Sequence, residues 1–380
     1  MTEQFVREIL FPVLQSGLGL DPPQIPLSEE DCRVLAAFGT RQSILPLFLR
    51  GMKRQGVPPT WLEAQKQNES LCLYNYVLQK DALEKIGTAL GHAEIPWLPL
   101  KGAVIRDLYP EPWMRTSSDV DVLVHEEDLD RAVAVLEAET SFRAKARDYH
   151  DISLYSEQVL LELHFSILEN MQSIDPLLSR VWNYTVPAGE GFRCAMTPEY
   201  QIFHVLAHMS YHLLHGGLGI RPFLDLWLLE YHTEFDREKL RELCRESGLL
   251  PFYEVGLHMT EVWLENAPHT KQTAALERCC LEGGVFDSGR LTGAVRQREK
   301  RGLRYLLSRL FVGRGMLEEM YPALKKHPWL FPFFQIRRWF RLLDPEKRRS
   351  AAGDIAAVRA VTAQDIRAYD RLLSDLGFSK

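Results

Sequence analysis

The stretch that most constrains this chain runs from residue 95 to residue 124 and reads IPWLPLKGAVIRDLYPEPWMRTSSDVDVLV. This pattern predicts a short strand, a turn led by Gly102 into a helix, a proline-broken loop and a second strand. Because successive side chains of a strand point to opposite faces, Asp119 and Asp121 share one face and the valines that alternate with them face the core. Two neighbouring carboxylates repel each other unless a cation lies between them, and Mg²⁺ prefers such oxygen ligands. The pair therefore predicts a divalent metal site.

Length and composition limit the class of protein. The chain has 380 residues, which is too long for one small core and favours two or three structural units. Its hydrophobic content of 46% and charged content of 25% are typical of a soluble globular protein. No apolar run approaches the roughly 20 residues that a membrane span needs, and the early acidic residues argue against a signal peptide. The six cysteines show no C-x-x-C spacing, so we expect reduced thiols and a cytoplasmic location.

Charge is unevenly distributed along the chain. Residues 296–350 contain 15 Lys and Arg against 5 Asp and Glu, so this segment carries +10 while the rest carries −16. Such asymmetry indicates an anionic partner without identifying it. Within the segment, residues 325–341 mix aromatic and basic side chains, which could lie on a membrane surface or stack on single-stranded nucleic acid. We favour an aromatic face that packs on the core and leaves the basic residues outside.

Hydrophobic periodicity divides the chain into three parts. Residues 1–94 have a helical pattern, with a capping box at Ser28 and a long helix predicted from Thr60 to Leu90. Residues 95–168 are the α/β part, and residues 169–380 have helical patterns again. In the last part, Thr197-Pro198 predicts the start of a helix that ends at His215, because Gly216-Gly217 follows.

The α/β part contains a third acidic residue beside the Asp-x-Asp strand. A helix is predicted from His125 to Glu139, followed by two strands, 151–155 and 159–165, which form a hairpin around a short polar turn. On the second strand, Glu162 and His164 share a face. Three carboxylates from two adjacent strands could hold two metal ions roughly 4 Å apart, an arrangement that stabilises both oxygens of a phosphoryl or nucleotidyl displacement. A Gly-led turn at a helix N-terminus, at Gly102, also favours phosphate binding.

The order of these parts resembles the nucleotidyltransferase superfamily that includes DNA polymerase beta and the aminoglycoside nucleotidyltransferases. More closely, it resembles an uncharacterised bacterial nucleotidyltransferase family with a Leu-Lys-Gly motif, a Tyr-Pro turn and an arginine before Asp-x-Asp. The residues that carry the resemblance are Leu100-Lys101-Gly102, Tyr109-Pro110, Arg115, Asp119-Val120-Asp121 and Glu162-Leu163-His164. The resemblance is specific over residues 98–165 and extends more weakly to His208, His212, Arg221 and Asp225.

This resemblance implies a fold, an activity and a set of site residues. The fold is α+β, with a small mixed-sheet nucleotidyltransferase palm (95–168) between a helical N-terminal region (1–94) and a helical C-terminal domain (169–380). Asp119, Asp121 and Glu162 would be the catalytic metal ligands for Mg²⁺, with two ions expected and Mn²⁺ as a substitute, and Glu162 would help to deprotonate the acceptor. The reaction would transfer a nucleoside monophosphate from a triphosphate such as ATP to an acceptor hydroxyl, releasing pyrophosphate.

The remaining candidates are nucleotide-binding or cleft residues, and each has a structural alternative. Lys101 and Arg115 would contact phosphate, although Lys101 could be a surface lysine and Arg115 could only neutralise carboxylates. His164 belongs to the same strand face as Glu162. The histidine stripe of 204, 208 and 212 has the i, i+4 spacing of zinc-binding helices but lacks the accompanying glutamate, so His208 and His212 are interpreted as a cleft wall or as packing. Arg221 and Asp225 would belong to that wall or form a structural ion pair.

Two other function classes stay open. A glycosyltransferase could hold a nucleotide-sugar diphosphate through a metal on Asp-x-Asp, but its nucleotide-binding α/β region usually precedes the motif, where this chain has helical patterns. A catalytically silent nucleotide-binding or scaffold protein is the other, because Ala103 follows Gly102 where Gly or Ser is usual and Glu162 stands where Asp is commoner. A small-molecule acceptor suits the acidic remainder of the chain, whereas a protein or RNA acceptor would use the basic segment. Changing Asp119 and Asp121 to Asn should abolish metal-dependent triphosphate binding.

Overall fold

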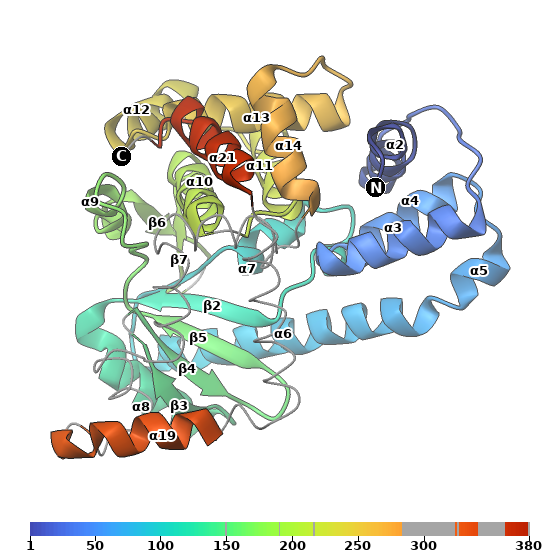
Figure 1. The fold of residues 1–380 in the computed structure, drawn as a ribbon. Helices are drawn as coiled ribbons and strands as arrows, with labels where there is room; N and C mark the ends of the chain where they lie inside the picture. Colours follow the sequence, from blue (N-terminus) through green and yellow to red (C-terminus); the bar gives the residue numbers. More distant parts are fainter. Residues whose placement is uncertain are drawn as a thin grey trace.

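The computed structural model describes residues 1–148, 150–189, 191–215, 217–282, 324, 327–340 and 362–378. In these parts the chain forms helices around one mixed five-stranded sheet, which confirms the predicted α+β fold class (Figure 1). No helix in the described part of the chain has the length and apolar character needed to cross a membrane. Most of the basic segment 296–350 lies outside the described residues. Of its described aromatic side chains, Trp329 and Phe333 are exposed and Phe334 is buried.

The N-terminal region is helical, as predicted. Ser28 and Asp31 form the expected capping box at the start of α3. The long helix predicted from Thr60 to Leu90 is interrupted, because the chain turns at residues 64–65 between α5 and α6. The elements of this region are α1 (Glu3–Phe5), the π-helical η1 (Val6–Leu10), α2 (Phe11–Leu18), α3 (Glu29–Arg41), α4 (Leu45–Arg54), α5 (Pro59–Glu63) and α6 (Lys66–His92).

The sheet contains β1 (Trp97–Pro99), β2 (Asp119–Val124), β3 (Arg143–Arg147), β4 (Asp151–Tyr155) and β5 (Leu160–His164). Their order is β1-β2-β5-β4-β3, in which β2 and β5 are parallel and every other neighbouring pair is antiparallel. The hairpin of β4 and β5 confirms the predicted one. The edge strand β3 was not predicted, because all five of its residues are exposed and their sequence, RAKAR, has no apolar alternation.

Short helical segments connect the strands of the sheet. Between β1 and β2 lie α7 (Gly102–Ile105), η2 (Arg106–Leu108) and η3 (Pro112–Met114), so the predicted helix after Gly102 is only one turn of α-helix. Between β2 and β3 lie η4 (Glu126–Asp128) and α8 (Leu129–Glu139), where one helix from His125 was predicted.

The chain after the sheet is mainly helical, apart from a small two-stranded sheet. As predicted, α10 ends at His215. The elements are α9 (Asp175–Leu178), η5 (Val181–Tyr184), β6 (Thr185–Pro187), β7 (Cys194–Met196), α10 (Pro198–His215), α11 (Arg221–His232), α12 (Arg237–Ser247), α13 (Leu250–Leu264), α14 (Lys271–Glu282), η6 (Pro328–Leu330), α19 (Phe331–Phe340) and α21 (Ala363–Asp375).

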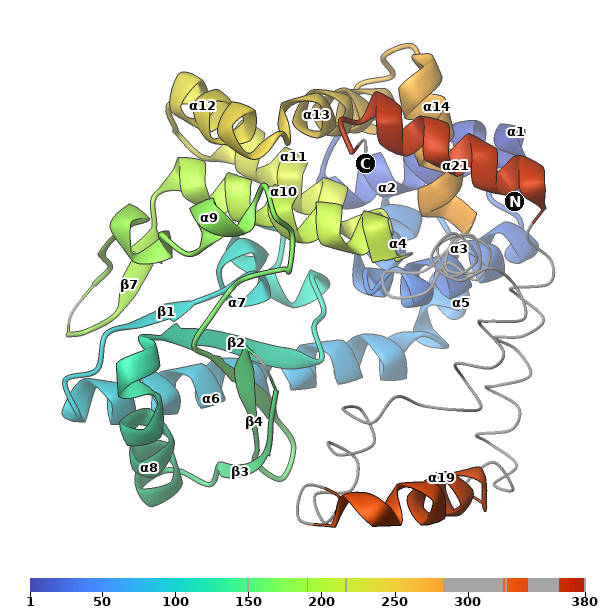
Figure 2. The ribbon, with the colours of Figure 1, turned by 60° about the vertical axis from the view of Figure 1, so that its left-hand side comes forward.

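The two faces of the sheet pack against different helices. Val120 and Val122 of β2 lie in one hydrophobic core with Ile86 of α6 and Leu136 of α8. The opposite face turns toward α10 and α11, which lie on the far side of β2 from α6 (Figure 2). On that side, Leu123 joins a larger core that also contains residues of α2, α4, α13 and α21. Alternation along β2 therefore separates an apolar face from the face that carries Asp119 and Asp121.

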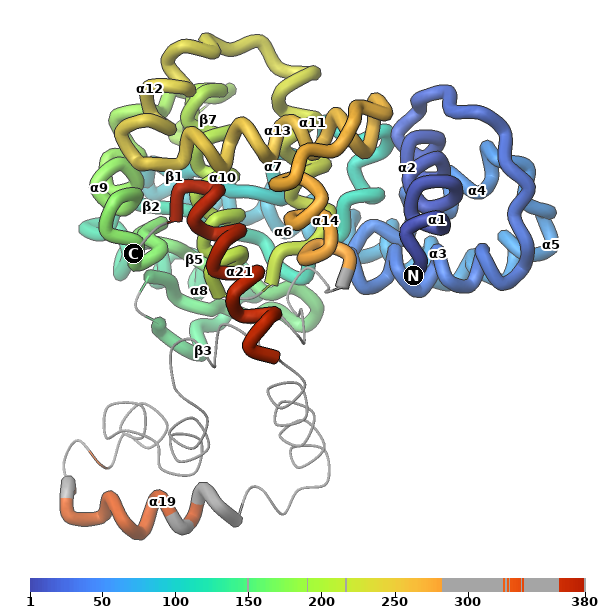
Figure 3. Tube along the Cα trace, turned by 45° about the horizontal axis from the view of Figure 1, so that its top comes forward, coloured from blue at the N-terminus to red at the C-terminus, as the bar shows by residue number. Residues whose placement is uncertain are grey.

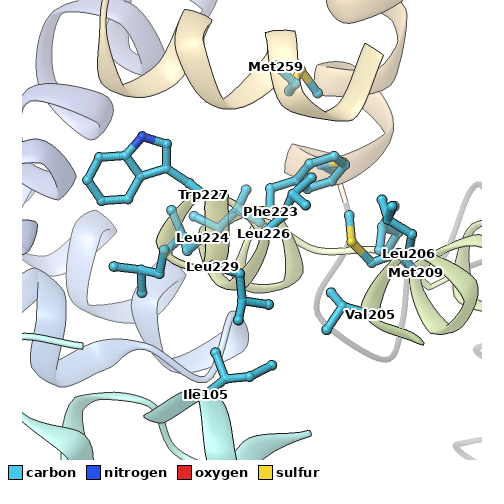
Figure 4. Packing of buried hydrophobic residues seen from close by; sticks show 14 of the residues in the cluster. Ile105, Val205, Leu206, Met209, Phe223, Leu224, Leu226, Trp227, Leu229 and Met259 are labelled. Atoms are coloured by element: carbon cyan, nitrogen blue, oxygen red, sulfur yellow. The ribbon is translucent and has the colours of Figure 1, made fainter. Parts of the chain in front are cut away.

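The larger core connects the two ends of the chain. The helices α1 to α5 form a group at one end of the molecule, and α21 lies beside α14 and α10 (Figure 3). Tyr369 of α21 donates a hydrogen bond to the carbonyl of Leu213 in α10. At the centre, Phe223 and Leu226 of α11 lie among the buried side chains, and Ile105 of α7 approaches them from the sheet side (Figure 4). The division at residues 94 and 168 stays a prediction, while the packing shows that residues 1–94 contribute to both cores.

Candidate active site

A pocket of about 310 Å³ lies between the acidic face of the sheet and the helices α10 and α11. All of the residues that the sequence singled out line it, namely Lys101, Gly102, Arg115, Asp119, Asp121, Glu162, His164, His208, His212, Arg221 and Asp225. A larger cavity of about 670 Å³ lies behind β2, where Val120 and residues of α6 line it. The smaller pocket is the candidate active site, because the strand face that carries the carboxylates opens into it.

Strand register brings the acidic residues together. Asp121 of β2 is paired with Glu162 of β5 in the parallel ladder, so the two side chains lie next to each other on one face. Asp119, two residues before Asp121, lies on the same face. One ligand atom each of Asp121, Glu162 and His164 lies within 4.8 Å of the others. The sequence predicted adjacent strands, and the register confirms it.

His164 is buried and holds the carboxylates at its Nε2 atom. This nitrogen lies 3.0 Å from Asp121 Oδ1 and 3.6 Å from Glu162 Oε2. Because ionised carboxylates only accept hydrogen bonds, Nε2 carries a proton and donates a hydrogen bond to Asp121. Burial alone would raise the pKa of Asp121, but Lys101 and His164 outweigh burial and hold the pKa well below its ordinary value. Asp121 is therefore ionised throughout the neutral range.

Asp119 lies outside this close group in the described structure. Its Oδ2 accepts a hydrogen bond of 3.3 Å from Ser118 Oγ. Burial and the nearby charges of Asp121 and Glu162 raise the pKa of Asp119. Repulsion of this kind is expected where carboxylates share a site, and a divalent cation would relieve it.

Lys101 supplies positive charge at the edge of the acidic group. Its Nζ lies 3.7 Å from Asp121 Oδ1, and its side chain is mostly buried. Burial by itself would lower the pKa of Lys101, but Asp121, Glu169 and the other carboxylates outweigh it and raise the pKa. Lys101 also has φ of +45°, a conformation that is rare for residues other than glycine and that clusters at functional sites.

Gly102 is required by close packing. A Cβ atom at this position would lie 2.5 Å from Nη1 of Arg115, so the arginine occupies the space that a side chain would need. The amides of Ala103, Val104 and Ile105 donate to the carbonyls of Leu100 and Lys101. These three N–H groups are thus used inside the turn, which leaves less of the predicted phosphate cradle than a free helix N-terminus would offer.

Arg115 forms a buried ion pair across the pocket wall. Its Nε and Nη2 donate to Asp225 Oδ1 and Oδ2 at 2.8 and 2.7 Å, and Tyr109 also donates to Asp225. Of the two predicted roles of Arg115, the neutralisation of a carboxylate describes this geometry, with Asp225 as the partner. The pairing of Arg221 with Asp225 stays a prediction. Arg221 lines the pocket and donates to the carbonyl of Thr116 at 2.9 Å.

The histidines of α10 form a hydrogen-bonded chain with a residue that the sequence did not single out. His208 Nδ1 lies 2.8 Å from Glu169 Oε1, and His208 Nε2 lies 2.9 Å from His212 Nε2. Burial and the positive charge of Lys101 lower the pKa of both imidazoles, to about 4 for His212, so the rings are neutral. Burial raises the pKa of Glu169 to about 7. These three side chains can therefore share their protons in two ways. Either protonated Glu169 donates to His208, or His208 donates to ionised Glu169.

Glu169 and His150 are among the pocket residues that sequence reasoning missed. Glu169 follows β5 in an irregular segment and reaches His208 of α10 only through the tertiary fold. His150 precedes β4 by one residue and lies beside Asp151 and His164. His150 stands directly before the strand predicted from Asp151, and this position alone did not mark it as a pocket residue.

The donor set fits a divalent metal. Asp121 and Glu162 offer carboxylate oxygens on one strand face, with Asp119 beside them, and Mg²⁺ and Mn²⁺ prefer such ligands. Burial, together with the charges of Asp121 and Glu162, raises the pKa of Asp119, and a cation would relieve the repulsion among these carboxylates. The residues present therefore fit a divalent cation of this kind.

A family model described as an uncharacterised nucleotidyltransferase matches residues 28–265. A comparison with curated proteins found no match, and a comparison with solved structures found none either. The matched range includes the whole five-stranded sheet, both helices of the pocket wall and all the predicted site residues. Because this range is more than half of the chain, the protein belongs to this uncharacterised nucleotidyltransferase family.

Proposed function

We propose that the protein transfers a nucleoside monophosphate from a nucleoside triphosphate to a hydroxyl group of a small molecule, with Mg²⁺ as cofactor and pyrophosphate as the second product. One observation carries this proposal. Asp119 and Asp121 of β2 share a face with Glu162 of β5, which is in direct register with Asp121, and that face opens into the pocket. Family membership alone implies nucleotidyl transfer, whereas the metal, the donor and the acceptor are inferred from the pocket.

Each group has a role that follows from its position. Asp119, Asp121 and Glu162 would hold the metal, which supplies positive charge to the phosphate oxygens as they react. His164 orients Asp121 through its Nε2 hydrogen bond, as outer ligands do in metal sites. Lys101, kept protonated by its carboxylate neighbours, provides a fixed charge for a phosphate group. Glu162 is the candidate to accept the proton of the attacking hydroxyl.

The acceptor side is the wall formed by α10 and α11. His208 and His212 are neutral and linked to each other, so they give this wall a polar but uncharged surface toward a bound molecule. The pocket volume of about 310 Å³ is at the small end of the range for ligand sites. We propose a small acceptor over a protein or RNA, because the pocket lies between the sheet and this helical wall.

The glycosyltransferase alternative lacks its expected scaffold. Its nucleotide-binding α/β region would precede the Asp-x-Asp strand, and the described residues before β1 form only helices. A catalytically silent protein differs from our proposal in its products and not in its fold. Product formation therefore distinguishes a transferase from the silent protein. The choice between triphosphates and UDP-sugars distinguishes a nucleotidyltransferase from a glycosyltransferase.

The first experiment is a thermal-shift panel of ATP, GTP, CTP, UTP and UDP-sugars, each with and without Mg²⁺ or Mn²⁺. A ligand that binds only the folded state stabilises it by about 2.7 kcal/mol at a hundredfold excess over Kd. We expect a metal-dependent shift with a triphosphate, and loss of that shift in Asp119→Asn. Asp130→Asn, an exposed aspartate on α8, is the matched control and should behave as the wild type.

Incubation with the selected triphosphate and a library of hydroxyl compounds then tests transfer through release of pyrophosphate. A shift only with UDP-sugars would favour the glycosyltransferase. Nucleotide binding without pyrophosphate release across the library would favour the silent protein. An undiminished, metal-dependent shift in Asp119→Asn would remove Asp119 from the metal site.

A further inference from the structure

A second group of potential metal ligands lies beside the carboxylates, on the other side of His164. It consists of His150, Asp151 and His164, with one ligand atom of each within 4.8 Å of the others. Asp151 of β4 pairs directly with His164 of β5 in the antiparallel ladder, so both side chains lie on the face that carries Glu162. His150 Nε2 lies 3.1 Å from Asp151 Oδ2.

His164 is prepared for a cation at its second nitrogen. Its Nε2 lies against Asp121, so Nδ1 is the ring nitrogen that remains to meet a cation. His164 is only 3% exposed, and its buried Nδ1 atom has no hydrogen-bond partner among the described residues. Buried polar atoms normally find a partner. A histidine that donates one N–H to a carboxylate while its other nitrogen binds metal is the usual arrangement in protein metal sites.

The ligand types identify the class of cation. Two imidazoles and one carboxylate suit Zn²⁺, Co²⁺, Mn²⁺ or Fe²⁺, whereas Mg²⁺ takes mainly oxygen ligands. Ligand atoms that are each about 2.1 Å from a tetrahedral ion lie roughly 3.4 Å apart. The 3.1 Å separation in the His150–Asp151 pair is close to this value, and the three ligand atoms, which lie within 4.8 Å of one another, would draw together around an ion.

We propose that His150, Asp151 and His164 bind a transition-metal dication of the zinc class, at a site separate from the Mg²⁺ ligands Asp119, Asp121 and Glu162. Asp151 and His164 are buried, while His150 is partly exposed and lines the pocket, so an ion can enter from the pocket. His164 would then connect the two sites, with its Nε2 proton on Asp121 and its Nδ1 on the transition metal. This proposal does not depend on nucleotide chemistry.

The test uses the full-length, metal-free protein and Co²⁺ as the probe, followed by Zn²⁺ stoichiometry from elemental analysis. We expect one tightly bound Co²⁺ with the strong visible absorption of a low-coordinate site that contains nitrogen ligands, and its displacement by Zn²⁺. His150→Ala should weaken Co²⁺ binding roughly 100-fold or more, since even the loss of an outer partner costs 10–100-fold. His150 is half-buried at the pocket wall, so this variant should fold, which circular dichroism checks.

Three further variants separate this site from others. Asp119→Asn should keep the cobalt spectrum, because Asp119 is not a member of the group. His232→Ala, an exposed histidine of α11, is the matched control and should bind Co²⁺ as the wild type does. His212→Ala should also keep the spectrum. The proposal is overturned if wild-type protein binds no Co²⁺ above the level of a weak oxygen site, or if His150→Ala leaves affinity and spectrum unchanged, or if His212→Ala removes them.

Discussion

Asp225 is the residue on which the wall of the pocket depends. It is 4% exposed and accepts hydrogen bonds from Tyr109 and from two nitrogens of Arg115. The Arg115 side chain in turn packs against Gly102, and both residues line the pocket. The ion pair therefore fixes the distance between α11 and the turn that carries Lys101.

Replacement of Asp225 by Asn tests this pair at the residue scale. The amide keeps the size of the side chain but leaves the buried charge of Arg115 uncompensated, so we expect a loss of about 3–5 kcal/mol in the free energy of unfolding. Urea denaturation measures it. Glu29→Gln, which removes an exposed partner of Arg33, should cause no measurable loss. A loss for Asp225→Asn as small as that of the control would mean that the pair contributes little.

Glu169 predicts a pH dependence of stability with a definite sign. Its pKa rises from 4.5 to about 7 on folding, so between these values the folded chain holds a proton that the unfolded chain has lost. The free energy of unfolding therefore falls as pH rises through this window, and the cost is complete above pH 7. Glu169→Gln does not titrate, so its stability relative to wild type should increase from pH 5 to pH 8.

This prediction is measured by denaturation at several pH values without divalent cations. Glu246→Gln changes an exposed carboxylate and should give a difference from wild type that varies little with pH. A pH-independent difference for Glu169→Gln would show that the folded structure does not raise the pKa of Glu169.

At the scale of elements, α2 and α4 pack so closely that their crossing depends on two glycines. A Cβ at Gly17 would overlap the carbonyl of Leu47, and a Cβ at Gly51 would overlap the carbonyl of Val13. Backbone atoms cannot move aside as the end of a flexible side chain can. The crossing therefore allows no side chain at either position.

Gly51→Ala should separate the two helices and lower the free energy of unfolding by about 1–3 kcal/mol or more, since overpacking forces backbone shifts. Gly91→Ala, in the last turn of α6, meets no atom within 4 Å and should be neutral or stabilising, because Ala is the better helix former. Thermal unfolding of both variants measures the contrast. Equal stability of the two variants would contradict the close packing of α2 on α4.

At the scale of the whole molecule, the sheet depends on helices from both sides of it in the sequence. Ile86 of α6 covers Val120 and Leu161 on one face, and α10 lies over the other face. The N-terminal helices share their core with α13 and α21, so the two helical regions also stabilise each other.

A fragment of residues 95–168 should therefore not fold alone, although it contains every strand of the main sheet. We expect no cooperative thermal transition and poor dispersion of its amide proton resonances, since one face of the sheet loses α6 and the other loses α10 and α11. A longer fragment, 66–168, adds α6 and should gain helical circular dichroism by packing on the Val120 face. Cooperative unfolding of the 95–168 fragment would show that the palm is an independent domain.

Local patterns carried much of the fold. The capping box at Ser28, the hairpin of β4 and β5, and the end of α10 at His215 each depend on residues within a few positions of one another. The interruption between α5 and α6 was missed, because no glycine or proline marks residues 64–65. The strand β3 was missed because its stability comes from backbone pairing with β4 and not from apolar side chains.

The α+β class and the nucleotidyltransferase family could be predicted from sequence patterns. The shared face of Asp119 and Asp121 could be predicted as well, because alternation along a strand is a local property. Only the tertiary structure decided the partners of these residues. The parallel register puts Glu162 beside Asp121, and the helical wall pairs Asp225 with Arg115 and Glu169 with His208. Such contacts join residues about 40 to 110 positions apart, and burial in the assembled pocket gives them their electrostatic strength.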